Sequence, residues 1–424
     1  MFYMVVACWA PLAVSALLLH PSARLGSSHA YRALVNMALH DAPADSSCAG
    51  GGGTDTAHAA ARALEVAAWS PSVDFVEFTV EMYAMMVGDQ ERTAAFELAI
   101  QRRLAGHAGD WVVLDIGTGP SAILSVFAAL AGAKRVYAIE ANAAIAERAR
   151  EAVALVEHPE RGSIAPGTIV VVEGFSTAVT LPERADLLVA EIVGSVASEE
   201  GMYRTIQDAR RRHLKRPDDP ASFIPARCQT VAVPASYAEH HKKACNWTAS
   251  GPPVRLTCSS PWLRPLSTPQ LWEDFALWED PTATAAGNVL SLPAPLEFRI
   301  SGATIEANRQ LFAEQLEQLE DVPAGRAAEL AVEMSSSISG LACWPRIVLD
   351  EGSVTEDEPP IIIESRGSEG EPRTSHWQTV LPLLCTKPVA VGAGDVVSVV
   401  PTITLAEEGE SPPHYEISAT LLSE

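Results

Sequence analysis

Apolar residues form a short block at residues 111–116 (WVVLDI), and the block ends in two glycines spaced one apart, Gly117 and Gly119. A run of this length predicts a buried strand, and glycine after it allows a tight turn with positive φ. The apolar stretch at residues 121–131 then predicts a crossover helix. Together these elements predict a βαβ unit with a pocket at the glycine turn.

A second predicted strand, residues 133–140 (AKRVYAIE), ends in the carboxylate of Glu140. In a βαβ unit, an acid at this distance from the glycine turn lies against the ribose hydroxyls of a nucleoside ligand. Pro120 and Ser121 stand where a dinucleotide-binding turn needs its third glycine, and nothing in the segment is shaped for a pyrophosphate. S-adenosylmethionine has a ribose and no phosphate, so it fits this pattern better than NAD.

The pattern changes along the chain and divides it into three parts. Residues 1–56 begin with an apolar run and continue as a flexible lead-in rich in Ser, Ala, Gly and Asp. Residues 57–224 predict two or three helices over 57–106 and then alternating strands and helices. Residues 225–424 predict mostly strands broken by Pro and Gly, with one clear helix at 303–321. The expected fold class is α/β, followed by a β-rich domain.

The composition is globular, because 48% of the 424 residues are hydrophobic and 20% are charged. A net charge of −23 disfavours direct nucleic-acid binding and favours basic partners, although acidity that only keeps the chain soluble is an equal alternative. The seven cysteines include no close pair of the kind that binds zinc, so no metal is expected. Their scatter indicates a reducing compartment, cytoplasm or nucleus, unless the uncharged residues 1–19 act as a signal sequence or membrane anchor.

Two carboxylates follow the last predicted strand of the α/β part. Residues 185–191 (ADLLVAE) end in Glu191 at the carboxyl edge of the sheet, where open α/β sheets bind their ligands. Glu200 follows nine residues later, at the predicted start of a helix. A single acid in that position is more often a surface residue that interacts with the helix dipole. The spacing nevertheless allows both carboxylates to converge on one pocket.

Several segments, in the same order, resemble the protein arginine methyltransferases. Residues 85–93 resemble the helix before the family's first strand, residues 113–119 its cofactor motif, and residues 137–140 its ribose-binding strand end. Residues 191–202 are similar to the family's double-glutamate loop, and residues 374–380 (TSHWQTV) to its Thr-His-Trp loop. Order and spacing across about 300 residues make this agreement hard to obtain by chance.

The resemblance covers roughly residues 75–400 and implies a Rossmann-like methyltransferase domain followed by a C-terminal β-barrel domain. It implies that Glu191 and Glu200 hold a substrate guanidinium, since paired carboxylates match its fork of donors. It also implies that His376, oriented by Asp89, accepts or relays a proton. The resemblance assigns six residues to binding of S-adenosylmethionine: Met86, Arg92, Asp115, Gly117, Gly119 and Glu140.

The resulting hypothesis is an S-adenosylmethionine-dependent arginine N-methyltransferase that acts on basic or Arg/Gly-rich proteins as a homodimer. Two alternatives stay open. Ser121 in the glycine turn, and Thr177 or Ala178 where many family members place an acid near the adenine amine, allow a degenerate member that serves as a binding scaffold. A small-molecule methyltransferase is the other alternative, weakened by Glu200 and the His-Trp loop. The sequence does not decide between mono-, symmetric and asymmetric dimethylation.

Overall fold

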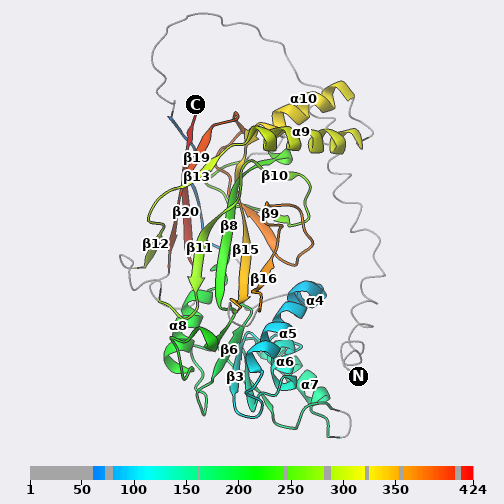
Figure 1. Cartoon of the computed structure of the whole chain (residues 1–424), viewed down its shortest axis with the longest axis vertical. Helices are drawn as coiled ribbons and strands as arrows, with labels where there is room; N and C mark the ends of the chain where they lie inside the picture. Colours follow the sequence, from blue (N-terminus) through cyan, green and yellow to red (C-terminus); the bar gives the residue numbers. More distant parts are fainter. Residues whose placement is uncertain are drawn as a thin grey trace, which may run out of the picture.

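The structure is a computed structural model, and it describes residues 61–71, 80–159, 162–241, 247–280, 288–319, 324–352, 358–405 and 412–423. Figure 1 shows a parallel α/β part at one end of the long axis and an extended antiparallel part above it. Helices α9 (Gly302–Glu317) and α10 (Ala324–Ser335) lie at the far end of the antiparallel part. The predicted lead-in at residues 1–56, including the apolar run, lies outside the described residues.

A five-stranded parallel sheet forms the α/β part, with the order β5-β4-β3-β6-β7. All five residues of its central strand are buried, so both faces of this strand are covered, as expected of a parallel sheet between helices. The predicted βαβ arrangement is therefore confirmed. The strands are β3 (Val112–Ile116), β4 (Arg135–Glu140), β5 (Ile169–Glu173), β6 (Leu187–Ala190) and β7 (Phe223–Ile224).

Helices flank this sheet, and Figure 1 shows α8 on the opposite side of it from α4 to α7. Asn142 caps the N-terminus of α7 by accepting from the backbone N–H groups of Ala144 and Ile145. Asp89 caps α5 by accepting from the Arg92 N–H. The helices are α4 (Val80–Gly88), α5 (Gln90–Leu104), α6 (Ile123–Leu130), α7 (Ala143–Val156) and α8 (Met202–Arg212).

The antiparallel part contains two larger sheets and a short two-stranded one. Strands β8 (Arg227–Tyr237) and β15 (Gly340–Asp350) form the centre of one large sheet, together with β9 (Val254–Thr257), β10 (Leu263–Pro265), β11 (Gln270–Ala276), β16 (Ile361–Glu364) and β17 (Gln378–Leu381). The other contains β1 (Ala61–Ala63), β2 (Ala67–Trp69), β12 (Val289–Ser291), β13 (Leu296–Arg299), β19 (Val396–Thr404) and β20 (His414–Leu422). The short sheet pairs β14 (Ser337–Ile338) with β18 (Val389–Ala390).

Two short strands precede the helices at the start of the α/β part. Residues 57–106 were predicted to form two or three helices, and α4 and α5 are two of these, but strands β1 (Ala61–Ala63) and β2 (Ala67–Trp69) were not predicted. Both pair with β20 near the C-terminus, and the Trp69 ring stacks on Tyr415 with 4.9 Å between centroids. Three-residue strands have no readable period of their own, so pairing with a distant strand decides their structure.

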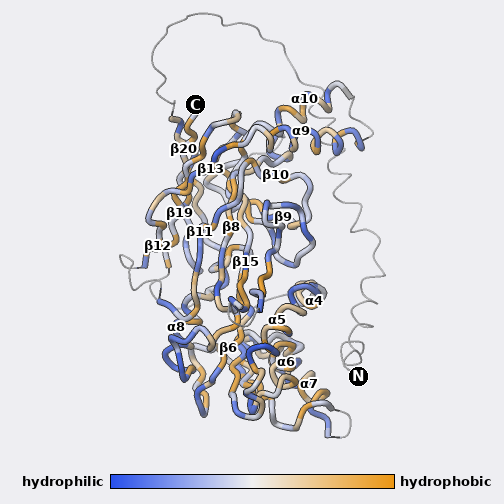
Figure 2. The backbone as a smooth tube through the Cα atoms, viewed as in Figure 1, coloured by the Kyte–Doolittle hydropathy of each residue, from blue (hydrophilic) through white to orange (hydrophobic). Residues whose placement is uncertain are grey.

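A continuous apolar core runs through both parts of the molecule. Figure 2 shows β8 and β15 as largely hydrophobic and α8 as mostly hydrophilic. The predicted helix at 303–321 is confirmed by α9, whereas α10 was not predicted. Four cysteines of the described chain, Cys228, Cys258, Cys343 and Cys385, are buried thiols without disulfide bonds. Within the described ranges, no helix has the length and apolarity needed to cross a bilayer.

We expect Leu114→Ala to lower the free energy of unfolding by about 2–5 kcal/mol, because the side chain is fully buried in the central parallel strand. Leu155→Ala is the matched control, since Leu155 is 63% exposed and its change is expected to stay within about 0.5 kcal/mol. Urea denaturation followed by circular dichroism measures both. Equal effects of the two substitutions would contradict the placement of Leu114.

Candidate active site

A cavity of about 1780 Å³ opens at the carboxyl ends of β3, β4 and β6. Its volume exceeds the roughly 300–1,000 Å³ of a typical small-molecule site, so it has room for two ligands side by side. Most of the predicted site residues lie on its wall: Met86, Arg92, Gly117, Gly119, Glu140, Glu191, Glu200 and His376. Asp89 and Asp115 do not.

The glycine turn after β3 forms the floor of this cavity. Gly117 and Gly119 have φ values of +75° and +66°, as the sequence predicts. A Cβ on Gly117 would lie 3.0 Å from the Ile192 side chain, so glycine allows the close approach of the turn to Ile192. The Gly119 N–H donates to Glu140 Oε2 at 3.0 Å, and the Asn142 N–H donates to Oε1 at 3.0 Å. These bonds hold the Glu140 carboxylate beside the turn.

Asp115 stabilises the turn from inside and does not contact the cavity. Its Oδ2 accepts from the hydroxyls of Thr118 and Ser125, each at 2.6 Å, and the residue is fully buried. Burial raises the pKa of Asp115 to about 6, against the lowering effect of the two hydroxyls. In the structure the Asp115 carboxylate ties the turn to α6, and its predicted cofactor contact stays a prediction.

Arg92 and Glu191 form a buried ion pair on the cavity wall. Arg92 Nη2, on α5, donates to Glu191 Oε2, and each side chain is 7% exposed. The Arg92 guanidinium also lies 5.6 Å from the centroid of the Phe96 ring. The resemblance assigns Arg92 to the cofactor and Glu191 to the substrate, but here the two are joined. A ligand that needs Arg92 Nη2 or Glu191 Oε2 must displace the other residue from that atom.

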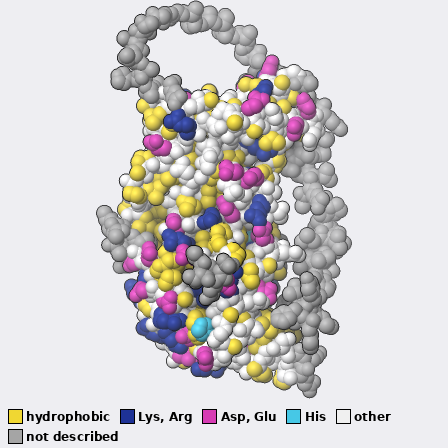
Figure 3. Space-filling model, in the orientation of Figure 1, with side chains coloured by type: hydrophobic (Ala, Val, Ile, Leu, Met, Phe, Trp, Pro, Cys, Tyr) yellow, Lys and Arg dark blue, Asp and Glu magenta, His cyan; other side chains and the backbone are white. Residues whose placement is uncertain are grey.

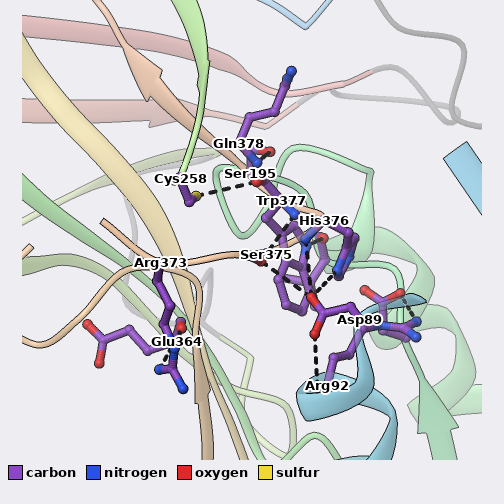
Figure 4. A network of polar contacts seen from close by, with 12 residues as sticks. Asp89, Arg92, Ser195, Cys258, Glu364, Arg373, Ser375, His376, Trp377 and Gln378 are labelled. Atoms are coloured by element: carbon purple, nitrogen blue, oxygen red, sulfur yellow. Dashed lines mark hydrogen bonds and ion pairs between the residues drawn. The ribbon is translucent and has the colours of Figure 1, made fainter. Parts of the chain in front are cut away.

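His376 and Asp89 form a second buried pair, at the junction of α5 with the antiparallel part (Figure 4). Asp89 Oδ2 lies 2.8 Å from His376 Nδ1 and also accepts from the His376 backbone N–H at 3.2 Å. Burial alone would raise the pKa of Asp89, but the hydrogen bonds from His376 and the Arg92 N–H lower it to about 2. An ionised Asp89 fixes the proton on Nδ1, which leaves Nε2 of a neutral imidazole as an acceptor.

Glu191 and Glu199 each pair with an arginine, whereas Glu200 does not within the described residues. Glu200 is half-buried on the cavity wall. Burial raises the pKa of Glu200 to about 8, with further raising by Glu191 and Glu199 and lowering by Arg255 and Arg92. The carboxylate therefore changes charge near neutral pH.

Several residues at the cavity were not among the predicted site residues. Tyr83, on α4, faces Glu140 and Glu200; burial and these two carboxylates raise its pKa to about 12. Glu199 is 3% exposed and pairs with Arg255 on β9. The sequence could have indicated Glu199, because it is a second acid directly next to Glu200. It could not have indicated Arg255, because the ion pair of Arg255 with Glu199 joins residues far apart in the chain.

The loop between Glu191 and Gly201 is held by backbone and hydroxyl contacts with the antiparallel part. The Trp377 indole N–H donates to the Val193 carbonyl at 2.7 Å, and the Gln378 N–H donates to Ser195 Oγ at 3.0 Å. The Ala197 N–H donates to Thr230 Oγ1 at 2.9 Å. These contacts fix the loop from one side along its length.

Charge is distributed unevenly around the cavity mouth. Figure 3 shows Lys and Arg side chains gathered around α8 on the face in view. Three arginines of this helix line the cavity, Arg204, Arg210 and Arg211, together with acids that include Asp208 and Asp218. Arg210 is already paired with Asp218 at 2.7 Å. The cavity mouth thus has mixed charge, although the chain as a whole is strongly acidic.

Known proteins share both sequence and fold with this chain, although no protein-family model matches it. The probable histone-arginine methyltransferase 1.4 of Arabidopsis thaliana is 29% identical over 318 residues, which is 74% of this chain and 52% of the relative. The crystal structure of Arabidopsis thaliana protein arginine methyltransferase 10 superimposes with a TM-score of 0.57 and 17% identity, covering 82% of this chain and 94% of that one. A Trypanosoma brucei PRMT1 enzyme-prozyme complex with AdoHcy gives a TM-score of 0.54, 17% identity, and coverage of 82% and 99%.

The chain is thus similar in sequence to histone-arginine methyltransferases and shares the fold of solved protein arginine methyltransferases. It spans about half the length of the Arabidopsis histone-arginine methyltransferase that it matches. The cavity holds Glu191 and Glu200 at the sheet edge, and His376 on its wall pairs with Asp89. Within the described ranges, no cluster of His, Cys, Asp and Glu is arranged to hold a metal ion.

Asp89→Asn should lower stability by about 1–2 kcal/mol at pH 6, because hydrogen bonds to an ionised carboxylate are lost. The folded pKa of Asp89 is about 2, below its ordinary value of 3.8, so the ionised form stabilises the protein above about pH 4. That advantage disappears as the pH falls towards 2. Urea unfolding at pH 6 and pH 2.5 checks this. A stability difference that is the same at both pH values would contradict the assignment.

Proposed function

We propose that this protein transfers methyl groups from S-adenosylmethionine to arginine guanidinium nitrogens of protein substrates. The observation that carries the proposal is the placement of Glu191 and Glu200 on one cavity wall, with Glu140 and the glycine turn on the same cavity. A guanidinium presents donors in a rigid fork, which two carboxylates can bind together. The similarity to protein arginine methyltransferases supports methyl transfer to arginine.

Residues on the wall fit the cofactor. Glu140 lies at the end of β4 beside Gly119, where its carboxylate can accept from ribose hydroxyls. Arg92 offers a cation for the amino-acid carboxylate of the ligand, and its Nε has no hydrogen-bond partner within the described chain. Met86 lines the same cavity. When bound, the cofactor supplies an electrophilic methyl group on a sulfonium.

The chain's own residues would hold and aim the acceptor. A protonated guanidinium is a poor nucleophile, so Glu191 and Glu200 must bind its charge and direct one nitrogen toward the methyl carbon. The new N–C bond forms as the S–C bond breaks, and the nitrogen then gives up one proton. His376 is the proposed acceptor of that proton at Nε2, and its Nδ1 contact with Asp89 supports this role.

The proposal includes the wider architecture and partners. We infer that the two large antiparallel sheets act as the β-barrel domain of the family, and that the chain assembles as a homodimer. Arg/Gly-rich proteins are the proposed substrates, because the chain carries a net charge of −23.

Glu191→Gln and Glu200→Gln should each reduce methyl transfer to an Arg/Gly-rich peptide by about 100-fold or more, because each removes charge from the guanidinium site. Transfer is measured with methyl-labelled S-adenosylmethionine, and cofactor binding by calorimetry is expected to change little for Glu200→Gln. Glu151→Gln is the control, since Glu151 is an exposed residue of α7. Full activity in both site variants would show that neither glutamate binds the substrate.

Methyl transfer should also depend on pH through Glu200. Its pKa of about 8 lies above the ordinary value, and the anionic form is the one that binds a guanidinium. At limiting substrate, kcat/KM should therefore rise about tenfold per pH unit below pH 8 and level off above it. A rate profile that is flat from pH 6 to pH 9, in a protein whose circular dichroism is unchanged, would exclude this role.

A further inference from the structure

Glu199 is a third carboxylate on the loop that carries Glu191 and Glu200, and it is buried at the cavity wall. Its side chain is 3% exposed, and Oε2 accepts from the Val196 N–H at 3.3 Å. A Cβ on Gly194 would lie 2.7 Å from the Glu199 Cβ, so the loop closes tightly around this side chain. A buried carboxylate in such a position requires a cation to remain ionised.

Arg255 provides that cation from the antiparallel part. Its Nη2 donates to Glu199 Oε1, and its Nη1 lies 3.4 Å from Oε2, so both carboxylate oxygens are engaged. Arg255 lies on β9 opposite Val380 of β17, the strand that begins two residues after His376. The ion pair thus links the glutamate loop to the strand that follows the proton acceptor.

We propose that Arg255 is a positioning residue for Glu200: by holding Glu199 inside the loop, it fixes the adjacent carboxylate relative to His376 and offsets the negative charge beside it. The inference rests on the proposed function, because the position of Glu200 matters for transfer only if Glu200 holds the substrate guanidinium. Arg255 does not contact the reacting atoms in this account; it acts through Glu199.

The charges that face Glu200 come from several elements. Glu191 and Glu199 lie on its own loop, Arg92 on α5, Arg255 on β9, and Tyr83 on α4. Burial is the main cause of its raised pKa, and Arg255 is the first of the two cations that oppose the rise. Without Arg255, Glu199 is uncompensated. Glu200 then requires a higher pH to lose its proton.

A titration of Glu200 itself tests the inference. Full-length protein labelled with ¹³C at the glutamate carboxyl carbon is titrated by NMR, and the Glu200 signal is assigned by its loss in Glu200→Gln. Arg255→Met is expected to move the Glu200 midpoint to higher pH, and Arg255→Lys to leave it near the wild-type value. The double variant Glu199→Gln/Arg255→Met removes both charges and should return the midpoint to the wild-type value or below.

An unchanged midpoint in a folded Arg255→Met protein would overturn the inference. If Arg255→Met does not fold, Glu199→Gln alone supplies the test: it removes a negative neighbour and releases Arg255, so the Glu200 midpoint must fall, and an unchanged midpoint overturns the inference equally. The kcat/KM profile of a folded Arg255→Met should shift in the same direction as the NMR midpoint, with about a tenfold loss per pH unit below it.

The two proposals fail in different ways. A wild-type protein that transfers no methyl group to arginine peptides refutes the proposed function, while the NMR titration still decides whether Arg255 and Glu199 control Glu200. Methyl transfer in the wild type, together with an Arg255→Met midpoint equal to that of the wild type, refutes the Arg255 inference alone.

Discussion

Three carboxylates on one short loop, Glu191, Glu199 and Glu200, repel one another, and the site depends on how that repulsion is compensated. Arg92 from α5 pairs with the first, and Arg255 from β9 pairs with the second. The third has no ion pair within the described chain, and burial beside its neighbours raises its pKa to about 8. Both cations come from outside the loop, so the loop holds its acids together only in the assembled protein.

Neither part of the molecule forms the cavity alone. The parallel sheet contributes the glycine turn and Glu140, while the antiparallel part contributes His376 and the contacts that hold the glutamate loop. A buried network strengthens this junction: Ser198 and Thr230 both donate to Glu273, a fully enclosed carboxylate whose pKa is raised by burial, and Ser198 lies 2.8 Å from the Tyr415 hydroxyl. Satisfied polar groups of this kind specify one arrangement of the two parts.

The sequence predicted what depends on local pattern. Apolar blocks and spaced glycines gave the βαβ unit, and the acids at strand ends fell on one cavity because parallel strands end at the same edge. Two points stay predictions: the division into a methyltransferase domain and a β-barrel domain, and the chemical roles of the site residues. Pattern did not reveal that Arg92 pairs with Glu191, that Asp115 bonds within the turn, or that β1 and β2 join β20. Each of these contacts depends on the direction of one side chain or on a partner far away in the chain. The local spacing of hydrophobic and polar residues contains no information on either.

The central claim is that Glu191 and Glu200 together bind a substrate guanidinium, and a crystal structure with S-adenosylhomocysteine and an arginine peptide tests it most directly. The account predicts one guanidinium within hydrogen-bond distance of both carboxylates, with Arg92 released from Glu191 and turned toward the amino-acid carboxylate of the cofactor product. A guanidinium bound elsewhere, with the Arg92–Glu191 ion pair intact, would contradict it.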